Sequence, residues 1–176
     1  MTPYLVEWNP LIHFFRAHPS IDAVTDALAV SDIGTEYEDK FWIEEIDVTV
    51  AALEVAESIA GNLGPELHKR LINFVNPLWG GSDPIHELCD ERESGQSLAM
   101  SVSPRTVASL AIRLSENDLQ AIAAAIEGAK YDREWYFPSS GTFIRYLSCW
   151  IRLFQSAHDR SLGVVVTLYP NEVDSE

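Results

Sequence analysis

The clearest pattern in the chain is an apolar stripe at helical spacing between residues 142 and 160. Phe143, Leu147, Trp150 and Phe154 recur every three or four residues, which is the spacing of one face of an α-helix. Flanking apolar residues widen this stripe, so the pattern predicts a long helix that is buried almost all round. The remaining narrow strip is polar and carries Arg145, Ser148, Arg152 and Gln155.

Shorter apolar stripes predict further helices, and their start signals are mostly serine, aspartate or proline. Asn9-Pro10 predicts a helix from Leu11 to His18, and Ser20 and Asp47 each cap a following stripe. A further helix is expected over 66–75, after Pro65. Ser103-Pro104 begins a helical pair over 104–127, in which Ser115 and Asp118 have the spacing of a capping box.

The strand signals are fewer. Residues 163–169 are apolar and β-branched after a glycine, which predicts a strand, and residues 97–102 predict another. Residues 41–46 fit either a strand or the start of a helix, residues 4–8 fit a short strand or a lead-in, and the polar segment 31–40 is expected to be an exposed loop. We therefore predict a single α+β domain over residues 1–176, mostly helical, with a small sheet of about three strands built from 41–46, 97–102 and 164–169.

Net charge says more about possible partners than the overall composition does. The 176 residues include 27 acids and 12 bases, a formal charge of −15, and residues 1–60 hold 12 acids against two bases. Such a field repels phosphate backbones and anionic lipid and attracts basic proteins. It disfavours nucleic acid and membranes as partners, although acidity that only keeps the protein soluble is the simpler interpretation.

Several features bear on the compartment of the cell. There are two cysteines, Cys89 and Cys149, no signal-peptide pattern at residues 1–8, and no apolar run of membrane-spanning length. From these features we expect a cytoplasmic protein, and the general character of the sequence suggests a bacterial one. The sequence leaves the oligomeric state open.

Motifs for catalysis and for cofactors are absent from the sequence. There is no His-x-x-x-His or Cys-x-x-Cys pair, no phosphate-binding glycine loop and no Gly-x-Ser-x-Gly elbow. His86 and Cys89 have helical spacing but make only two of the four ligands of a structural zinc site. We expect no metal, no cofactor and no catalytic residues, and we incline against an enzyme without excluding one assembled from distant residues.

Two groups of residues remain as candidate sites. The first is an acidic segment with aromatic residues that could bind a basic protein: Glu36, Tyr37, Glu38, Asp39, Trp42, Glu44 and Glu45. The simpler alternative is that Phe41 and Trp42 belong to the core and the acids are only solvated. The second could line a pocket for an anionic small molecule, unless its arginines only pair with the plentiful acids: Trp79, Trp135, Tyr136, Arg145 and Arg152.

Residues 76–169 contain, in this order, the stretches PLWGGSDP, LAMSVSPRTVASLAIRLSENDLQAIAAAI, YFPSSGTFIRYLSCWIRLFQSAHDR and GVVVTLY. This order of features resembles the YfbM-like family of uncharacterised bacterial proteins. It covers about half of the chain and implies a mixed α+β fold in a bacterial cytoplasmic protein. It implies no activity and no site residue.

These observations favour a non-enzymatic, acidic protein-binding or inhibitor protein, such as an immunity protein against a basic toxin or nuclease. An enzyme or small-molecule binder that uses the aromatic and arginine residues is the alternative. A structural subunit of a larger assembly is a third possibility.

Overall fold

The computed structural model describes residues 2–18, 20–29, 33–37, 47–78, 100–129 and 137–167. The fold is α+β, as predicted, with helices around one antiparallel sheet. Four described strands make the sheet in the order β2-β1-β4-β3. Their bounds are β1 (Thr2–Val6), β2 (Gly34–Glu36), β3 (Met100–Val102) and β4 (Gly163–Thr167).

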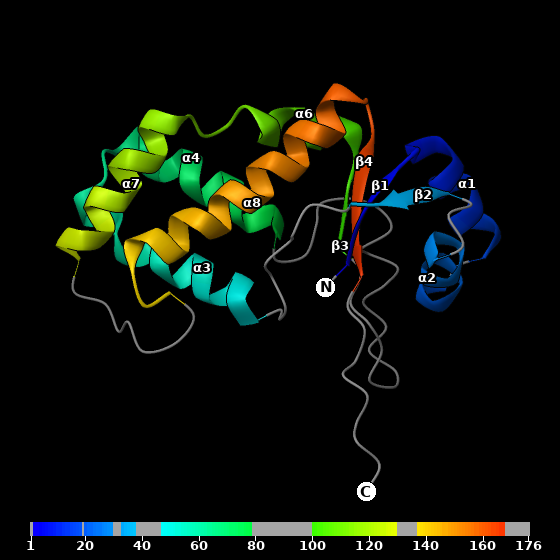
Figure 1. The fold of residues 1–176 in the computed structure, drawn as a ribbon, viewed down its shortest axis with the longest axis horizontal. Coiled ribbons are helices and arrows are strands. Elements are labelled where there is room, and N and C mark those ends of the chain that lie inside the picture. The colour runs from blue at the N-terminus through cyan, green and yellow to red at the C-terminus, as the bar shows by residue number, and fades with distance from the viewer. Residues whose placement is uncertain are drawn as a thin grey trace, which may run out of the picture.

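The helices lie on both faces of this sheet and give three layers (Figure 1). One face carries α1 (Trp8–Ala17) and α2 (Ile21–Ala29). The opposite face carries a helical bundle of α3 (Asp47–Ser58), α4 (Pro65–Val75), α6 (Pro104–Ala111), α7 (Glu116–Gly128) and α8 (Ser140–Asp159). Short 3₁₀ turns at Ala60–Asn62 and Asn76–Leu78 follow α3 and α4.

Helix α8 is the centre of the bundle, as its apolar stripe predicted. Phe143, Leu147 and Phe154 are completely buried, and Trp150 is nearly so. The Phe154 ring stacks on Trp150 at 5.7 Å between centroids and meets Phe74 of α4 edge-on at 6.0 Å. These side chains belong to the same apolar core as Leu5, Val164 and Val166, so the bundle packs on one face of the sheet.

The other face of the sheet has a smaller core. Tyr4, Val6 and Val165 point toward α1 and α2, because successive strand side chains alternate between faces. They pack against buried residues of these two helices: Leu11, Phe15, Val24 and Leu28.

Two glycines let α1 and α2 approach the sheet closely. Val6 is paired with Gly34 on β2 and with Gly163 on β4, so the three residues form one row across the sheet. A Cβ atom on Gly34 would lie 2.9 Å from Leu28, and one on Gly163 would lie 2.5 Å from the Trp8 ring. Side chains of α1 and α2 therefore fill the space that a larger residue would need.

Helix α8 ends in a Schellman motif. Leu162 donates its N–H to Ala157 O (2.9 Å) and Ser161 donates to His158 O (2.9 Å). Ser161 is left-handed, at φ 56°, and is the one non-glycine residue with positive φ in the described chain. This motif turns the chain from α8 into β4 and fixes where Arg160 leaves the helix.

The start of α7 also follows the sequence. The Ser115 hydroxyl accepts from Asp118 N (3.3 Å), and Asp118 Oδ2 accepts from Ser115 N (2.9 Å), which completes the predicted capping box. Asp118 also pairs with Arg70 of α4 at 2.5 Å. Partial burial raises the pKa of Asp118, but the hydrogen bonds from Ser115 and the charge of Arg70 outweigh this and lower it below the ordinary 3.8.

Three expectations about local structure need correction or lie outside the described residues. Helix α1 begins at Trp8 rather than after Asn9, with Pro10 in its first turn, where proline removes no intrahelical hydrogen bond. Residues 34–36 are a strand rather than loop, because β1 supplies backbone partners that the polar sequence does not reveal. Residues 41–46 and 97–99 lie outside the described residues, whereas 100–102 and 163–167 are strands as predicted.

Candidate functional site

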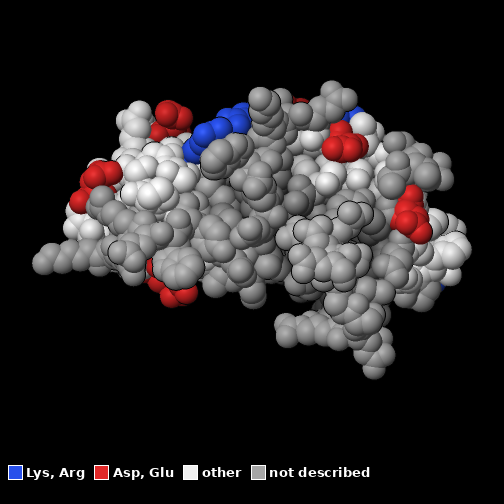
Figure 2. All heavy atoms as spheres, turned by 60° about the horizontal axis from the view of Figure 1, so that its bottom comes forward, with Lys and Arg blue, Asp and Glu red and all other residues white. Residues whose placement is uncertain are grey.

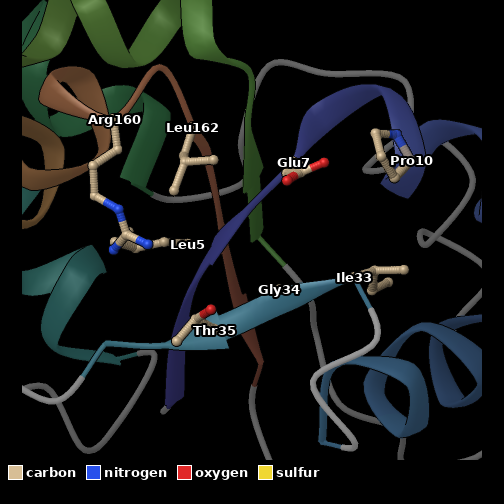
Figure 3. A pocket seen from close by; sticks show the side chains of 8 residues that line it. All are labelled: Leu5, Glu7, Pro10, Ile33, Gly34, Thr35, Arg160 and Leu162. Atoms are coloured by element: carbon tan, nitrogen blue, oxygen red, sulfur yellow. The ribbon is translucent and has the colours of Figure 1, made fainter.

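A hollow of about 270 Å³ lies where β1, β2, α1 and the end of α8 meet (Figure 3). Its floor is Leu5 of β1, and Ile33, Gly34 and Thr35 of the β2 segment make one wall. Arg160 and Leu162 come from the turn between α8 and β4, and Glu7 and Pro10 come from the start of α1. The hollow thus lies beside the bundle, at the side of the sheet where β2 is the edge strand.

Two opposite charges lie on different sides of this hollow. The Arg160 side chain extends toward Leu5, whereas the Glu7 carboxylate lies on the far side, beside Pro10 (Figure 3). Both residues are exposed. Within the part of the chain that the structure describes, neither side chain has a hydrogen bond or an ion pair. The hollow therefore offers a donor and an acceptor that have no partner among the described residues.

Next to the hollow, the outer edge of β2 has main-chain groups without a partner among the described residues. Tyr37 donates its N–H to Pro3 O at 2.9 Å, and Thr35 is paired with Leu5. In an antiparallel pair the residues alternate between facing the partner strand and facing away. The N–H and C=O groups of Gly34 and Glu36 therefore point away from β1, and no described residue binds them.

Two of the residues predicted to bind a partner lie on this strand or directly after it. Glu36 is exposed on β2, and Tyr37 is half-buried against the apolar core of the bundle side. Tyr37 is thus partly a core residue. The aromatics that the simpler interpretation placed in the core, Phe41 and Trp42, lie outside the described residues. The other members of that predicted site lie outside the described residues: Glu38, Asp39, Trp42, Glu44 and Glu45.

The predicted aromatic and arginine pocket is represented only by its arginines. Arg145 and Arg152 are seven residues apart on α8 and exposed on the same side of the helix. Arg152 donates to the sulfur of the buried Cys149 at 3.5 Å. Neither arginine lines the hollow described above. The remaining members lie outside the described residues: Trp79, Trp135 and Tyr136.

Sequence reasoning missed Glu7, Arg160 and the hollow itself. Glu7 and Arg160 were each treated as an ordinary surface charge, because no sequence pattern indicates that positions 7 and 160 are close in space. The antiparallel pairing of β1 with β4 brings them to one end of the sheet. A reliable prediction of that pairing would have been the only useful signal.

Most of the negative charge lies outside the described residues. The described residues hold 12 acids and eight bases, or −4, so −11 of the −15 belongs to the rest of the chain. On the face drawn in Figure 2, the described acidic side chains stand at separate places and form no continuous patch.

The described ranges contain no group of three or more histidine, cysteine, aspartate or glutamate side chains that could hold a metal ion. Among the helices in these ranges, none combines the length and the apolar character needed to cross a membrane. His86 and Cys89 lie outside the described residues.

Comparison with known proteins adds no relative. No family model matches the chain, and no curated protein and no solved structure is significantly similar to it. The resemblance to the YfbM-like family stays a prediction.

Proposed function

We propose that this chain is an acidic, non-enzymatic protein-binding protein of the inhibitor type, which captures a basic partner through residues 36–45. The observation that supports it best is the position of Glu36 on β2, which is an edge strand among the described strands. Glu36 is exposed on β2, and its main-chain groups point away from the sheet. Added strands commonly bind at such edges, with main-chain hydrogen bonds giving affinity.

Charge supports the same proposal. Residues 1–60 carry 12 acids and two bases. A basic protein approaching this part of the chain is steered by long-range attraction, which raises the association rate at low salt. Binding of this kind weakens as salt shortens the range of the electrostatic field to about 8–10 Å.

The test compares two variants of equal net charge. In the first, five acids of the proposed site are reversed to lysine: Glu36, Glu38, Asp39, Glu44 and Glu45. In the control, five acids elsewhere are reversed in the same way, all of them exposed: Asp26, Glu54, Glu57, Glu66 and Asp159. Each immobilised variant is exposed to native cell lysate at low salt and eluted with a salt gradient, and the bound proteins are identified by mass spectrometry.

We expect one basic protein to be retained by the wild type and by the control variant and to be lost from the site variant. Its affinity, measured afterwards with the purified partner, should fall at least tenfold in the site variant and should decrease with salt. Equal loss from both variants would mean that only net charge matters, and no loss from either would remove these residues from the proposal.

We also propose that the protein acts in the cytoplasm, where its two cysteines stay reduced. Cys149 is buried in α8 and fits a structural thiol.

A further inference from the structure

The hollow between β1, β2, α1 and the α8–β4 turn has features that suit a small ligand rather than a protein. Its volume of about 270 Å³ is just below the usual range of pockets for drug-sized molecules, so it has room for a small metabolite. Leu5, Ile33 and Leu162 give it an apolar part, and polar groups make up more of its lining surface. Leu5 is almost fully buried and packs in the bundle-side core, so the floor is held in place from below.

The two charges on the hollow are held by different elements. Arg160 is the last residue before the left-handed Ser161, so the Schellman motif of α8 determines where its side chain begins. Glu7 caps α1 through its carbonyl, which accepts from Leu11 N at 3.1 Å, and its side chain makes no capping hydrogen bond. The carboxylate is therefore not used by the helix and lies at the rim of the hollow (Figure 3).

The two charged side chains of the hollow, Arg160 and Glu7, indicate the class of ligand. A guanidinium binds a carboxylate well, often through two parallel hydrogen bonds, and a carboxylate accepts from an ammonium group. A molecule with only one of these charges would use only one of the two groups, so it should bind more weakly than a molecule with both. An apolar side chain on the same molecule would match Leu5, Ile33 and Leu162.

We propose that this hollow binds a small zwitterion of the amino-acid type, with its carboxylate on Arg160, its ammonium on Glu7 and an apolar body over Leu5. This proposal is independent of the protein-binding function, because it uses neither residues 38–45 nor the outward edge of β2.

The test measures binding by calorimetry or by ligand-observed NMR on the full chain. The probes are leucine, leucine methyl ester, which lacks the carboxylate, and N-acetyl-leucine, which lacks the ammonium. We expect leucine to bind with a dissociation constant on the order of a millimolar and each blocked form to bind about three to ten times more weakly. A series of ω-amino acids, with growing numbers of methylene groups between the ammonium and the carboxylate, then shows which separation of the two charges fits best.

Two substitutions assign each end of the ligand. Glu7→Gln should remove the preference for leucine over N-acetyl-leucine and keep the preference over the ester. Arg160→Gln should do the reverse. Arg152→Gln is the matched control, since Arg152 is an exposed arginine of the same helix that does not line the hollow, and it should leave all affinities unchanged.

Because Glu7 and Arg160 are exposed, both variants are expected to fold, which their melting temperatures will confirm. The proposal is overturned if no zwitterion of either series binds at tens of millimolar. It is equally overturned if the blocked forms bind as well as leucine, or if neither substitution changes the preferences.

Discussion

The two faces of the sheet are covered very differently. Among the described residues, the core on the bundle side has 31 buried hydrophobic residues from five helices, their connecting segments and the sheet, whereas the core under α1 and α2 has seven. Both cores meet at the same strands, because side chains of β1 and β4 alternate between them.

The two cores differ in how much packing holds each of them in place. In the large core each side chain has many neighbours, so α8 is fixed in place by redundant packing. The small core depends on single contacts, such as Trp8 over Gly163 and Leu28 over Gly34. Among the described strands, β2 lies at an edge of the sheet, and the hollow lies beside it.

The largest expected effect comes from truncating one phenylalanine in each core. Phe154→Ala should lower the free energy of unfolding by about 3–5 kcal/mol, because Phe154 is completely buried against Phe74 and Trp150. Phe15→Ala, in the small core, should cost about 3 kcal/mol or less. Urea unfolding measures both changes.

Hydrogen exchange distinguishes the two regions further. Phe15→Ala should speed exchange in α1 and α2 and leave α7 and α8 protected, since few contacts link the small core to the bundle. Uniformly faster exchange throughout the chain would mean that the two cores unfold as one unit, and the contrast drawn above would be wrong.

A smaller loss of stability is expected when Gly163 or Gly34 is replaced by a residue with a Cβ atom. Gly163→Ala places a Cβ atom 2.5 Å from the Trp8 ring and 3.1 Å from Val102 O, so it should lower stability by about 1–3 kcal/mol. Gly34→Ala should behave similarly. Gly61→Ala is the control, because its Cβ would meet nothing within 4 Å, and thermal unfolding should show little change.

A second substitution tests the cause. Adding Trp8→Leu to Gly163→Ala should recover part of the lost melting temperature, since the smaller side chain leaves room for the methyl group. If the double variant is as unstable as the sum of the single ones, the clash with Trp8 is not the reason.

The smallest effect concerns the surface of the bundle and depends on pH. The folded-state pKa of Asp118 lies below its ordinary 3.8. Its charge therefore stabilises the fold above that value, and this contribution is lost as pH falls through the lowered pKa. Asp118→Asn should cost about 0.5–1 kcal/mol near pH 7, from the weakened cap and the lost pairing with Arg70.

Urea unfolding at several pH values measures this difference between wild type and variant. The difference should shrink toward zero as pH falls below about 3.8. Arg70→Gln should reproduce only part of it, because the Ser115 hydrogen bonds remain. A difference that grows in acid would contradict the direction of the pKa shift.

The large core could be predicted from the sequence, and the small one only in part. The stripe of α8, the caps at Ser103 and Ser115 and the strand from Gly163 are local patterns, and each was found in the structure. Residues 34–36 carry no apolar alternation, so their pairing with β1 left no local signal.

The candidate site was less accessible to sequence reasoning, for a physical reason. Acidic and aromatic residues could be grouped only by closeness in sequence, and this gave the segment that includes Glu36 and Tyr37. Glu7 and Arg160 come together through the long-range pairing of β1 with β4. Charge and hydropathy patterns report nothing of such pairing.

The pairing of β1 with β4 also has a consequence during synthesis on the ribosome. Thr2 is the partner of Thr167, so β1 waits for a strand that is made about 160 residues later. At synthesis rates of about 5–20 residues per second, the wait lasts roughly ten to thirty seconds. During this time the edge of β1 that later pairs with β4 has no strand partner, whereas β2, its partner on the other edge, is made soon after β1. The nascent chain therefore exposes a strand edge that the finished sheet covers, and such edges promote aggregation.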